Sequence, residues 1–152
     1  MKSSLSWRSF LWIVLLTSLW INLSEVLRYF LWVRPNTQAY FADRLGIAEM
    51  NVLIFSIWGI WDMLLTASLV FTLWLCARQF GNNGIAIWIA ATQTWITLFV
   101  LFWVATANMG LASWSSIWMT LAWAWLEMVV GAWIAARLLI HDQTNKSLNY
   151  EI

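Results

Sequence analysis

Four long apolar segments restrict what this chain can fold into more than any other feature of its sequence. They run over Ser9–Trp32, Asn51–Ala77, Ile85–Ala107 and Ser113–Leu139. Each exceeds the roughly 20 residues that a helix needs to cross the ~30 Å hydrocarbon layer of a bilayer. The segments lack strand-type alternation and are far longer than the roughly 10 residues of a membrane β-strand. We therefore predict four transmembrane helices.

The composition agrees with this prediction. Charged residues make up 10% of the 152 positions and hydrophobic residues 62%, whereas a soluble surface needs roughly a quarter of its positions charged. We therefore predict an all-α integral membrane protein and exclude a soluble enzyme domain. Because the four segments leave no room for a further unit, residues 1–152 are predicted to form a single domain.

The connections between the spans are short, which predicts an up-down-up-down bundle of antiparallel neighbours. In the first connection, Pro35 is expected to end the first helix and Asn36 to cap a short helix lying in the membrane interface. The apolar face of that interfacial helix would consist of Tyr40, Phe41 and Leu45, and its end would be Gly46. The polar C-terminal tail, residues 140–152, is predicted to be disordered.

Basic residues near the ends of the spans predict the orientation of the chain. If the N-terminus lies inside, the inner flanks hold five such residues and the outer flanks three. The inner set is Lys2, Arg8, Arg78, Arg137 and Lys146, and the outer set is Arg28, Arg34 and Arg44. We therefore predict that both termini are cytoplasmic, in a cell membrane or a bacterial inner membrane. The first span lacks a small-residue cleavage site and is predicted to be a retained helix.

Several functional classes are excluded by what the sequence lacks. A net charge of +1, with basic residues spread from end to end, provides no stripe for nucleic acid. Cys76 is the only cysteine and His141 the only histidine, which rules out dithiol redox chemistry and paired haem ligands. Metal-ligand spacings, phosphate-binding loops and nucleophile–base motifs are also missing. We expect no nucleic-acid partner, no metal site and no cofactor.

Carboxyl groups inside the predicted spans are the informative feature. A carboxylate at the bilayer centre costs at least ~2.5–3.5 kcal/mol, and the sequence places Glu25, Asp62 and Glu127 within or at the edge of spans. Each lies on a stripe whose spacings of three, four and seven put it on one helix face. The stripes are Ser18, Asn22, Glu25 and Tyr29; Asn51, Phe55, Trp58, Asp62 and Thr66; and Ser113, Ser116, Thr120, Trp123, Glu127 and Gly131. The third span contributes Gln93 and Thr97, and all four polar faces are predicted to line the bundle axis.

The helical rise of 1.5 Å per residue gives approximate depths. Asp62, Gln93 and Glu127 fall within about one turn of the midplane, and Asn22 with Glu25 roughly 10 Å nearer the outer face. This predicts two polar layers and a cavity that is open to the outside and closed inside. Two facing carboxylates would repel, so we expect them to hold or share a proton or a cation.

Polar side chains also hold membrane helices together, at ~0.6 kcal/mol per hydrogen bond. We favour that role for Asn22 and Gln93. Holding helices together does not require an ionisable group, so we favour a functional role for Asp62 and Glu127.

Tryptophan is unusually frequent in this sequence, with 15 residues. Trp58 and Trp123 lie one turn from Asp62 and Glu127. They would form an aromatic wall for an organic cation, a lipid headgroup or a flat apolar ligand, or else serve as packing.

We interpret the chain as a small multi-pass membrane protein with an acidic, tryptophan-lined polar core that binds or moves a small cation or a proton-coupled solute. Asp62 and Glu127 would form the proton or cation site and Glu25 an outer relay, with Asn22, Gln93, Trp58 and Trp123 around them. One alternative is an accessory subunit of a larger membrane complex, or a homo-oligomer, whose polar groups dock onto partner helices. Another is a lipid-modifying enzyme that uses Glu127 or Asp62 as a general acid or base.

Overall fold

The computed structural model describes residues 5–42 and 50–149, with side chains as far as Asp142. These residues form helices and contain no β-strand. The first helical run consists of α1 (Trp7–Arg28), the π-helical turn η1 (Tyr29–Val33) and α2 (Arg34–Phe41). The second is α3 (Val52–Phe80), the third comprises α4 (Gly84–Trp95), η2 (Ile96–Val100) and α5 (Leu101–Asn108), and the fourth is α6 (Trp114–Asn149). All four runs are long and apolar enough to cross a membrane, which confirms the predicted all-α fold.

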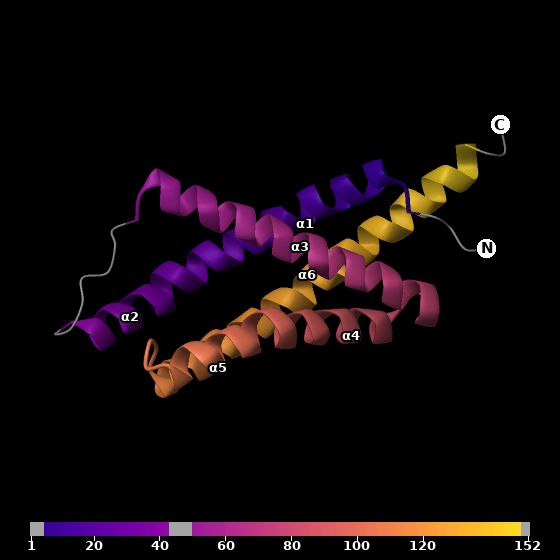
Figure 1. Cartoon of the computed structure of the whole chain (residues 1–152). Coiled ribbons are helices and arrows are strands. Elements are labelled where there is room, and N and C mark those ends of the chain that lie inside the picture. The colour runs from indigo at the N-terminus through magenta and orange to yellow at the C-terminus, as the bar shows by residue number, and fades with distance from the viewer. Residues whose placement is uncertain (1–4, 43–49, 150–152) are drawn as a thin grey trace.

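The four runs alternate in direction (Figure 1). The first and last described residues lie at one end of the bundle, together with the turn between α3 and α4. We call this the termini end, and the opposite end, where α2 stops and α6 begins, the loop end. Helices α1 and α4 each contact both α3 and α6, and α3 and α6 also contact each other across the bundle. The charged residues described below lie where α1, α3 and α6 meet.

Side-chain caps fix where the helices begin. Ser6, Asn51 and Asn83 each accept a hydrogen bond from a backbone N–H three residues later, at 3.0–3.2 Å. Such caps satisfy N–H groups that have no partner in the first turn of a helix. Helix α3 ends at Gly81, whose φ of 81° is a left-handed conformation that favours glycine. Polar residues at the segment boundaries therefore determine the helix starts.

The helix predicted in the first connection exists, but it continues directly from the first span, so the prediction that Pro35 ends the span is wrong. Figure 1 shows α2 extending along the line of α1. The π-helical turn η1 explains this continuity, because the Arg34 N–H donates to the Tyr29 carbonyl five residues earlier. The normal hydrogen-bond ladder is therefore already shifted where the ring and missing N–H of Pro35 would disturb it. Leu45 and Gly46 lie outside the described residues.

The prediction of a disordered tail is also wrong over most of its length, because α6 continues to Asn149. The hydroxyl of Ser9 donates a hydrogen bond to the Asp142 carboxylate at 2.6 Å, which holds α6 against the start of α1. Polarity alone does not end a helix, because a helix needs a residue that breaks it. The segment from His141 to Asn149 contains no glycine or proline that would end a helix.

Apolar side chains fill the half of the bundle nearest the termini. One buried cluster combines Ile13, Val14, Val70, Leu73 and Leu139 with alanines of α4 and α6. A second cluster, centred on Ile21, Leu69 and Met128, fills the middle. Small residues such as Ala90 and Ala135 allow the helix backbones to approach closely, as is usual between membrane helices. The axis is therefore closed by apolar packing toward the termini end.

Candidate functional site

Four ionisable side chains from three helices form a charged cluster, three of whose members are buried, and we define it as Glu25, Arg28, Asp62 and Glu127. Helix α1 contributes Glu25 and Arg28, α3 contributes Asp62, and α6 contributes Glu127. Arg28 is 4% exposed, Asp62 5% and Glu127 1%, and the Glu25 side chain is 19% exposed. Asp62 interacts electrostatically with Glu25 and Arg28, and Glu127 with all three others. The cluster thus contains three carboxyl groups and one guanidinium.

Arg28 is the member that sequence reasoning assigned to the membrane edge. In the structure it is buried, forms an ion pair with Glu25 one turn earlier, and lies over the ring of Phe99 with its Cζ 4.9 Å from the ring centroid. Its Nη1 is buried and has no hydrogen-bond partner in the described part of the chain. Arg28 therefore supplies positive charge inside the bundle, rather than at its rim.

Glu127 is held by a hydrogen-bonded chain that joins α6 to α1. Its Oε2 accepts a 2.8 Å hydrogen bond from the Ser24 hydroxyl. The same Ser24 oxygen accepts a 3.3 Å hydrogen bond from the indole N–H of Trp123. The other carboxyl oxygen, Oε1, is buried without a hydrogen-bond partner among residues 5–42 and 50–142. One oxygen of Glu127 is thus fixed by a hydrogen bond, and the other is buried with no hydrogen-bond partner in the described part of the chain.

Asp62 lies at the point where α3 joins the bundle. From Asn51 to Trp61 no residue of this helix is buried, and Asp62 is the first that is. Its backbone carbonyl accepts a 2.7 Å hydrogen bond from the Thr66 hydroxyl, which is also buried. At 1.5 Å per residue, Asp62 lies about 15 Å along α3 from its first residue, about half of the ~30 Å hydrocarbon layer.

Glu25 and Arg28 belong to the same layer as Glu127, so the predicted separation into two layers is wrong. Ser24, the neighbour of Glu25, bonds directly to Glu127. The depth estimate assumed that the first helix ended near Trp32, but the helical run continues to Phe41. Those additional residues add about 13 Å at the loop end, which places Glu25 correspondingly deeper.

Three other predicted site residues do not enter the cluster. Gln93 is exposed on the outer face of α4, where the residue that turns inward is Thr94. Trp58 is 48% exposed on the unpacked part of α3. Asn22 is half-buried and donates to the Ser18 carbonyl of its own helix at 2.8 Å. Of the predicted neighbours, Trp123 is the one that reaches the carboxyl groups, through Ser24.

Tryptophan side chains connect α6 to its neighbours. Five indole N–H groups donate hydrogen bonds between α6 and another helical run, and they belong to Trp20, Trp32, Trp95, Trp123 and Trp125. Three of the acceptors are backbone carbonyls of α6, which can accept a second hydrogen bond beside the helical one. Five of the 15 tryptophans therefore hold helices together. Trp123 is in addition connected to the Glu127 carboxyl group through Ser24.

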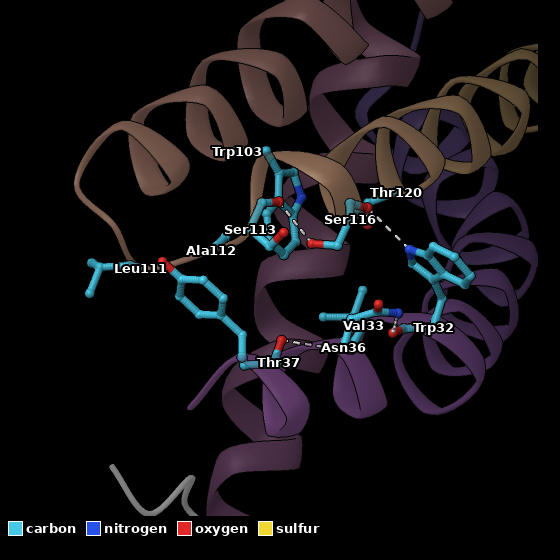
Figure 2. A pocket seen from close by; sticks show the side chains of 11 residues that line it. Trp32, Val33, Asn36, Thr37, Trp103, Leu111, Ala112, Ser113, Ser116 and Thr120 are labelled. Atoms are coloured by element: carbon cyan, nitrogen blue, oxygen red, sulfur yellow. Dashed lines mark hydrogen bonds between the residues drawn. The ribbon is translucent and has the colours of Figure 1, made fainter. Parts of the chain in front are cut away.

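A groove borders the charged cluster, and a small cavity lies apart from it near the loop end. A groove of about 430 Å³ lies between α1 and α6 and is lined by Trp20, Leu23, Met119, Trp123 and Leu126, with Ser24 and Glu127 in its wall. Near the loop end, a cavity of about 10 Å³ lies between α2, α5 and α6. Figure 2 shows this small cavity, with Trp32 donating its indole N–H to the Ser116 carbonyl at 3.1 Å.

The small cavity has roughly the volume of one water molecule. It is polar, because its walls include Asn36, Ser113, Ser116 and Thr120. It lies on the side where the sequence predicted an opening, but the larger space is the groove between α1 and α6. That groove is bounded by two helices on one side of the bundle, and thus differs from the axial cavity that the sequence predicted.

The fold and its apolar outer faces define the chain as a multi-pass integral membrane protein built as a four-helix bundle. No protein-family model, curated protein or solved structure matches it.

Proposed function

We propose that the charged cluster is a proton-binding and cation-binding site, and that the protein binds or moves a small cation or a proton-coupled solute. In this proposal Asp62 and Glu127 hold the proton or cation, and the more exposed Glu25 relays it. Arg28 is a fixed positive charge that balances one carboxylate, so fewer protons or cations are needed to neutralise the cluster. The observation that carries the proposal is the grouping of three carboxyl groups, two of them buried and one 19% exposed, around one buried guanidinium in an apolar bundle.

The physical argument is one of charge balance. With every group ionised, the cluster would hold an excess of negative charge where little water can stabilise it. A buried unpaired charge costs several kcal/mol in proteins. The excess is therefore neutralised by bound protons or by a cation, and the two compete for the same oxygens. The three carboxyl groups come from three helices, and among the described residues no three acidic, histidine or cysteine side chains are placed so that they could hold one metal ion together. We therefore propose a proton or an organic cation as the occupant.

The burial of Arg28 also supports the proposed orientation. Removing Arg28 from the count of flanking charges leaves five basic residues on the side of the termini and two, Arg34 and Arg44, on the opposite side. By the positive-inside rule this bias places the termini in the cytoplasm. Because apolar packing closes the half nearest the termini, the cluster would exchange protons with the opposite, outer side.

Infrared spectroscopy tests the proton-binding role directly, because a protonated carboxyl group absorbs separately from a carboxylate. Spectra of the purified protein in nanodiscs would be recorded over a series of pH values. We expect the wild type to show a protonated carboxyl band that changes with pH, and we expect Asp62→Asn and Glu127→Gln each to remove part of it. Both replacements keep the size and polarity of the side chain, and circular dichroism would verify that the helices persist.

Asp142→Asn is the matched control, because Asp142 lies beyond the cluster, beside Ser9 at the helix ends. It should leave in place the part of the pH-dependent band that Asp62→Asn and Glu127→Gln remove. If the bands of Asp62→Asn and Glu127→Gln both match that of the wild type, the cluster does not bind exchangeable protons and the proposed function is wrong.

A second function, docking onto another membrane helix, is favoured by Gln93. Its amide lies about one turn from the middle of the third span and is exposed on the outer face of the bundle. The exposed hydroxyls of Ser56, Ser68 and Thr97 each donate to a carbonyl of their own helix. A glutamine amide has two donors and an acceptor, and polar side chains of this kind join helices in membranes. We propose that Gln93 pairs with Gln93 of a second copy, because a two-fold axis along the membrane normal puts both amides at one depth.

This docking function predicts a defined mutational pattern. Interhelical polar contacts contribute about 1–2 kcal/mol in model peptides, so Gln93→Leu should weaken self-association about 5–30-fold. Thr97→Val, which removes a hydroxyl already bonded within its own helix, should leave it unchanged. Native mass spectrometry of the protein released from nanodiscs would measure the distribution of oligomers. A monomeric wild type, or equal association of wild type and Gln93→Leu, would contradict pairing through Gln93.

A further inference from the structure

The groove between α1 and α6 opens toward the bilayer. Its rim is formed by side chains that are largely exposed on the outer faces of the two helices, namely Leu23 at 56%, Met119 at 51% and Leu126 at 59%. In a membrane these faces contact lipid chains, so the groove is reached sideways from the hydrocarbon layer. Its volume of about 430 Å³ lies within the range of small-molecule binding sites, roughly 300–1,000 Å³.

The wall of the groove combines apolar surface, two indoles and one acidic group. Trp20 and Trp123 are half-buried and line it from α1 and α6. Both are tied to the Glu127 region, since Trp20 donates to the Glu127 backbone carbonyl at 3.2 Å and Trp123 donates to Ser24. Glu127 is a lining residue that is 1% exposed and has one carboxyl oxygen without a partner among the described residues. The groove therefore offers an acidic residue behind an aromatic and aliphatic surface.

We propose that this groove admits a lipophilic organic cation from the bilayer and holds it against the Trp20, Trp123 and Glu127 side of the charged cluster. The inference rests on the proposed function and names its substrate class. The apolar rim selects a ligand with an apolar body, and the indole faces attract a cation. The excess of carboxyl groups in the cluster selects positive over negative charge.

The depth of Glu127 in the membrane decides which of two occupants the groove would take, a free cation or a lipid headgroup. Glu127 lies 13 residues into α6 from Trp114, about 20 Å along the helix axis. That distance is well inside a hydrocarbon layer ~30 Å thick, whereas headgroups lie outside this layer. The occupant is therefore a molecule that dissolves in the hydrocarbon region as a whole. For each monovalent cation that binds, one proton leaves Glu127, so the charge of the cluster stays constant.

The probe pair tetraphenylphosphonium and tetraphenylborate tests the proposal, because the two ions share shape and apolar surface and differ in the sign of their charge. Binding would be measured by equilibrium dialysis against protein in phosphatidylcholine nanodiscs, with empty nanodiscs subtracted. We expect saturable binding of the phosphonium and none of the borate. In weakly buffered solution, phosphonium binding should also release a proton.

Three kinds of variant locate the site. Ala122→Trp and Leu23→Trp fill the groove from α6 and from α1, and each should weaken phosphonium binding about tenfold or more. Glu127→Gln should weaken it to a similar degree and abolish the proton release. Ala105→Trp places the same indole on the exposed face of α5, away from the groove, and should bind as the wild type does. Circular dichroism and gel filtration would confirm that each variant is folded.

The outcomes separate this inference from the proposed function. If the wild type binds the phosphonium and Glu127→Gln does not, but both groove-filling variants bind normally, the groove is not the route and the inference is wrong while the cation site stands. If phosphonium and borate bind equally and Glu127→Gln changes neither, the groove is an apolar site without charge selection, which overturns the inference. If the infrared bands change as expected but no phosphonium binds, proton binding stands and the lipophilic cation is excluded.

Discussion

Replacing Arg28 with methionine is expected to lower the free energy of unfolding by about 3–5 kcal/mol, the range observed when one partner of a buried ion pair is removed. Methionine is also long and fills similar space, so the loss of stability measures the effect of removing the positive charge and not of leaving a cavity. Without Arg28, Glu25 loses its ion-pair partner and the buried carboxyl groups of Asp62 and Glu127 lose their nearby positive charge. Unfolding in mixed micelles with increasing dodecyl sulfate, followed by tryptophan fluorescence, would measure the change.

Two further variants show whether the loss arises from charge imbalance. Arg28→Met combined with Glu25→Gln removes both partners and should recover a large part of the lost stability. Arg34→Met changes a half-buried arginine that lies 5.7 Å from the Phe30 ring and is not in the cluster, so it should cost below about 1 kcal/mol. Lowering the pH should stabilise Arg28→Met relative to the wild type, because protonation removes the uncompensated negative charge. Equal losses for Arg28→Met and Arg34→Met would contradict the buried cluster.

The fold class and the four spans were predictable because the length of the apolar segments decides both. A segment of more than 20 apolar residues has few alternatives to a membrane helix. The sequence also identified the two most buried carboxyl groups of the cluster, Asp62 and Glu127, since an ionisable group in an apolar segment stands out against its surroundings. The ends of the spans were less predictable, because η1 carries the helix through Pro35 and contacts between α1 and α6 extend the C-terminal helix.

The inward faces were harder to predict, because a membrane helix is apolar all round and lacks the polar outer face that orients a soluble helix. In α1 the most deeply buried face follows Thr17, Ile21, Ser24 and Arg28, one residue away from the predicted stripe of Ser18, Asn22, Glu25 and Tyr29. In α4, alanines and Thr94 turn inward and leave Gln93 outside. The face of α4 that turns inward is the one whose small residues pack closely against a neighbouring helix, so it depends on that neighbour as well as on the sequence of α4.

Arg28 was misplaced for a related reason. An arginine near the end of an apolar segment is normally an orientation signal, because its long side chain can reach the interface. Its burial depends on where the helix ends and on which residues α3 and α6 place opposite it. Spacing does contain a partial signal, since Arg28 is seven residues from Ile21 and four from Ser24, both of which are buried. The sequence alone offers no way to tell that face from the adjacent one.

Gly131 lies where α6 packs tightly against α1 and α3, and its replacement is expected to lower stability strongly. A Cβ atom at this position would lie 2.9 Å from Cδ1 of Ile21 in α1 and 3.1 Å from Cδ2 of Leu69 in α3. Both side chains are fully buried, so neither has space into which to move. Gly131→Leu should therefore lower the free energy of unfolding by about 3 kcal/mol, the upper part of the range for overpacked cores, and Gly131→Ala by less. The same dodecyl sulfate titration would measure both.

Gly59 is the matched control, because no atom lies within 4 Å of a Cβ built there. Gly59→Ala should be neutral or stabilise α3 by up to about 1 kcal/mol through helix propensity. Ile21→Val deletes the Cδ1 atom that the new Cβ would meet, and by itself costs about 0.5–1.5 kcal/mol. Combined with Gly131→Ala it should cost less than the sum of the two single changes, because each relieves the strain or void that the other creates. Additive losses would mean that α1 and α6 do not approach each other at Gly131, and the Ser24–Glu127 contact on the same two helices would then be in doubt as well.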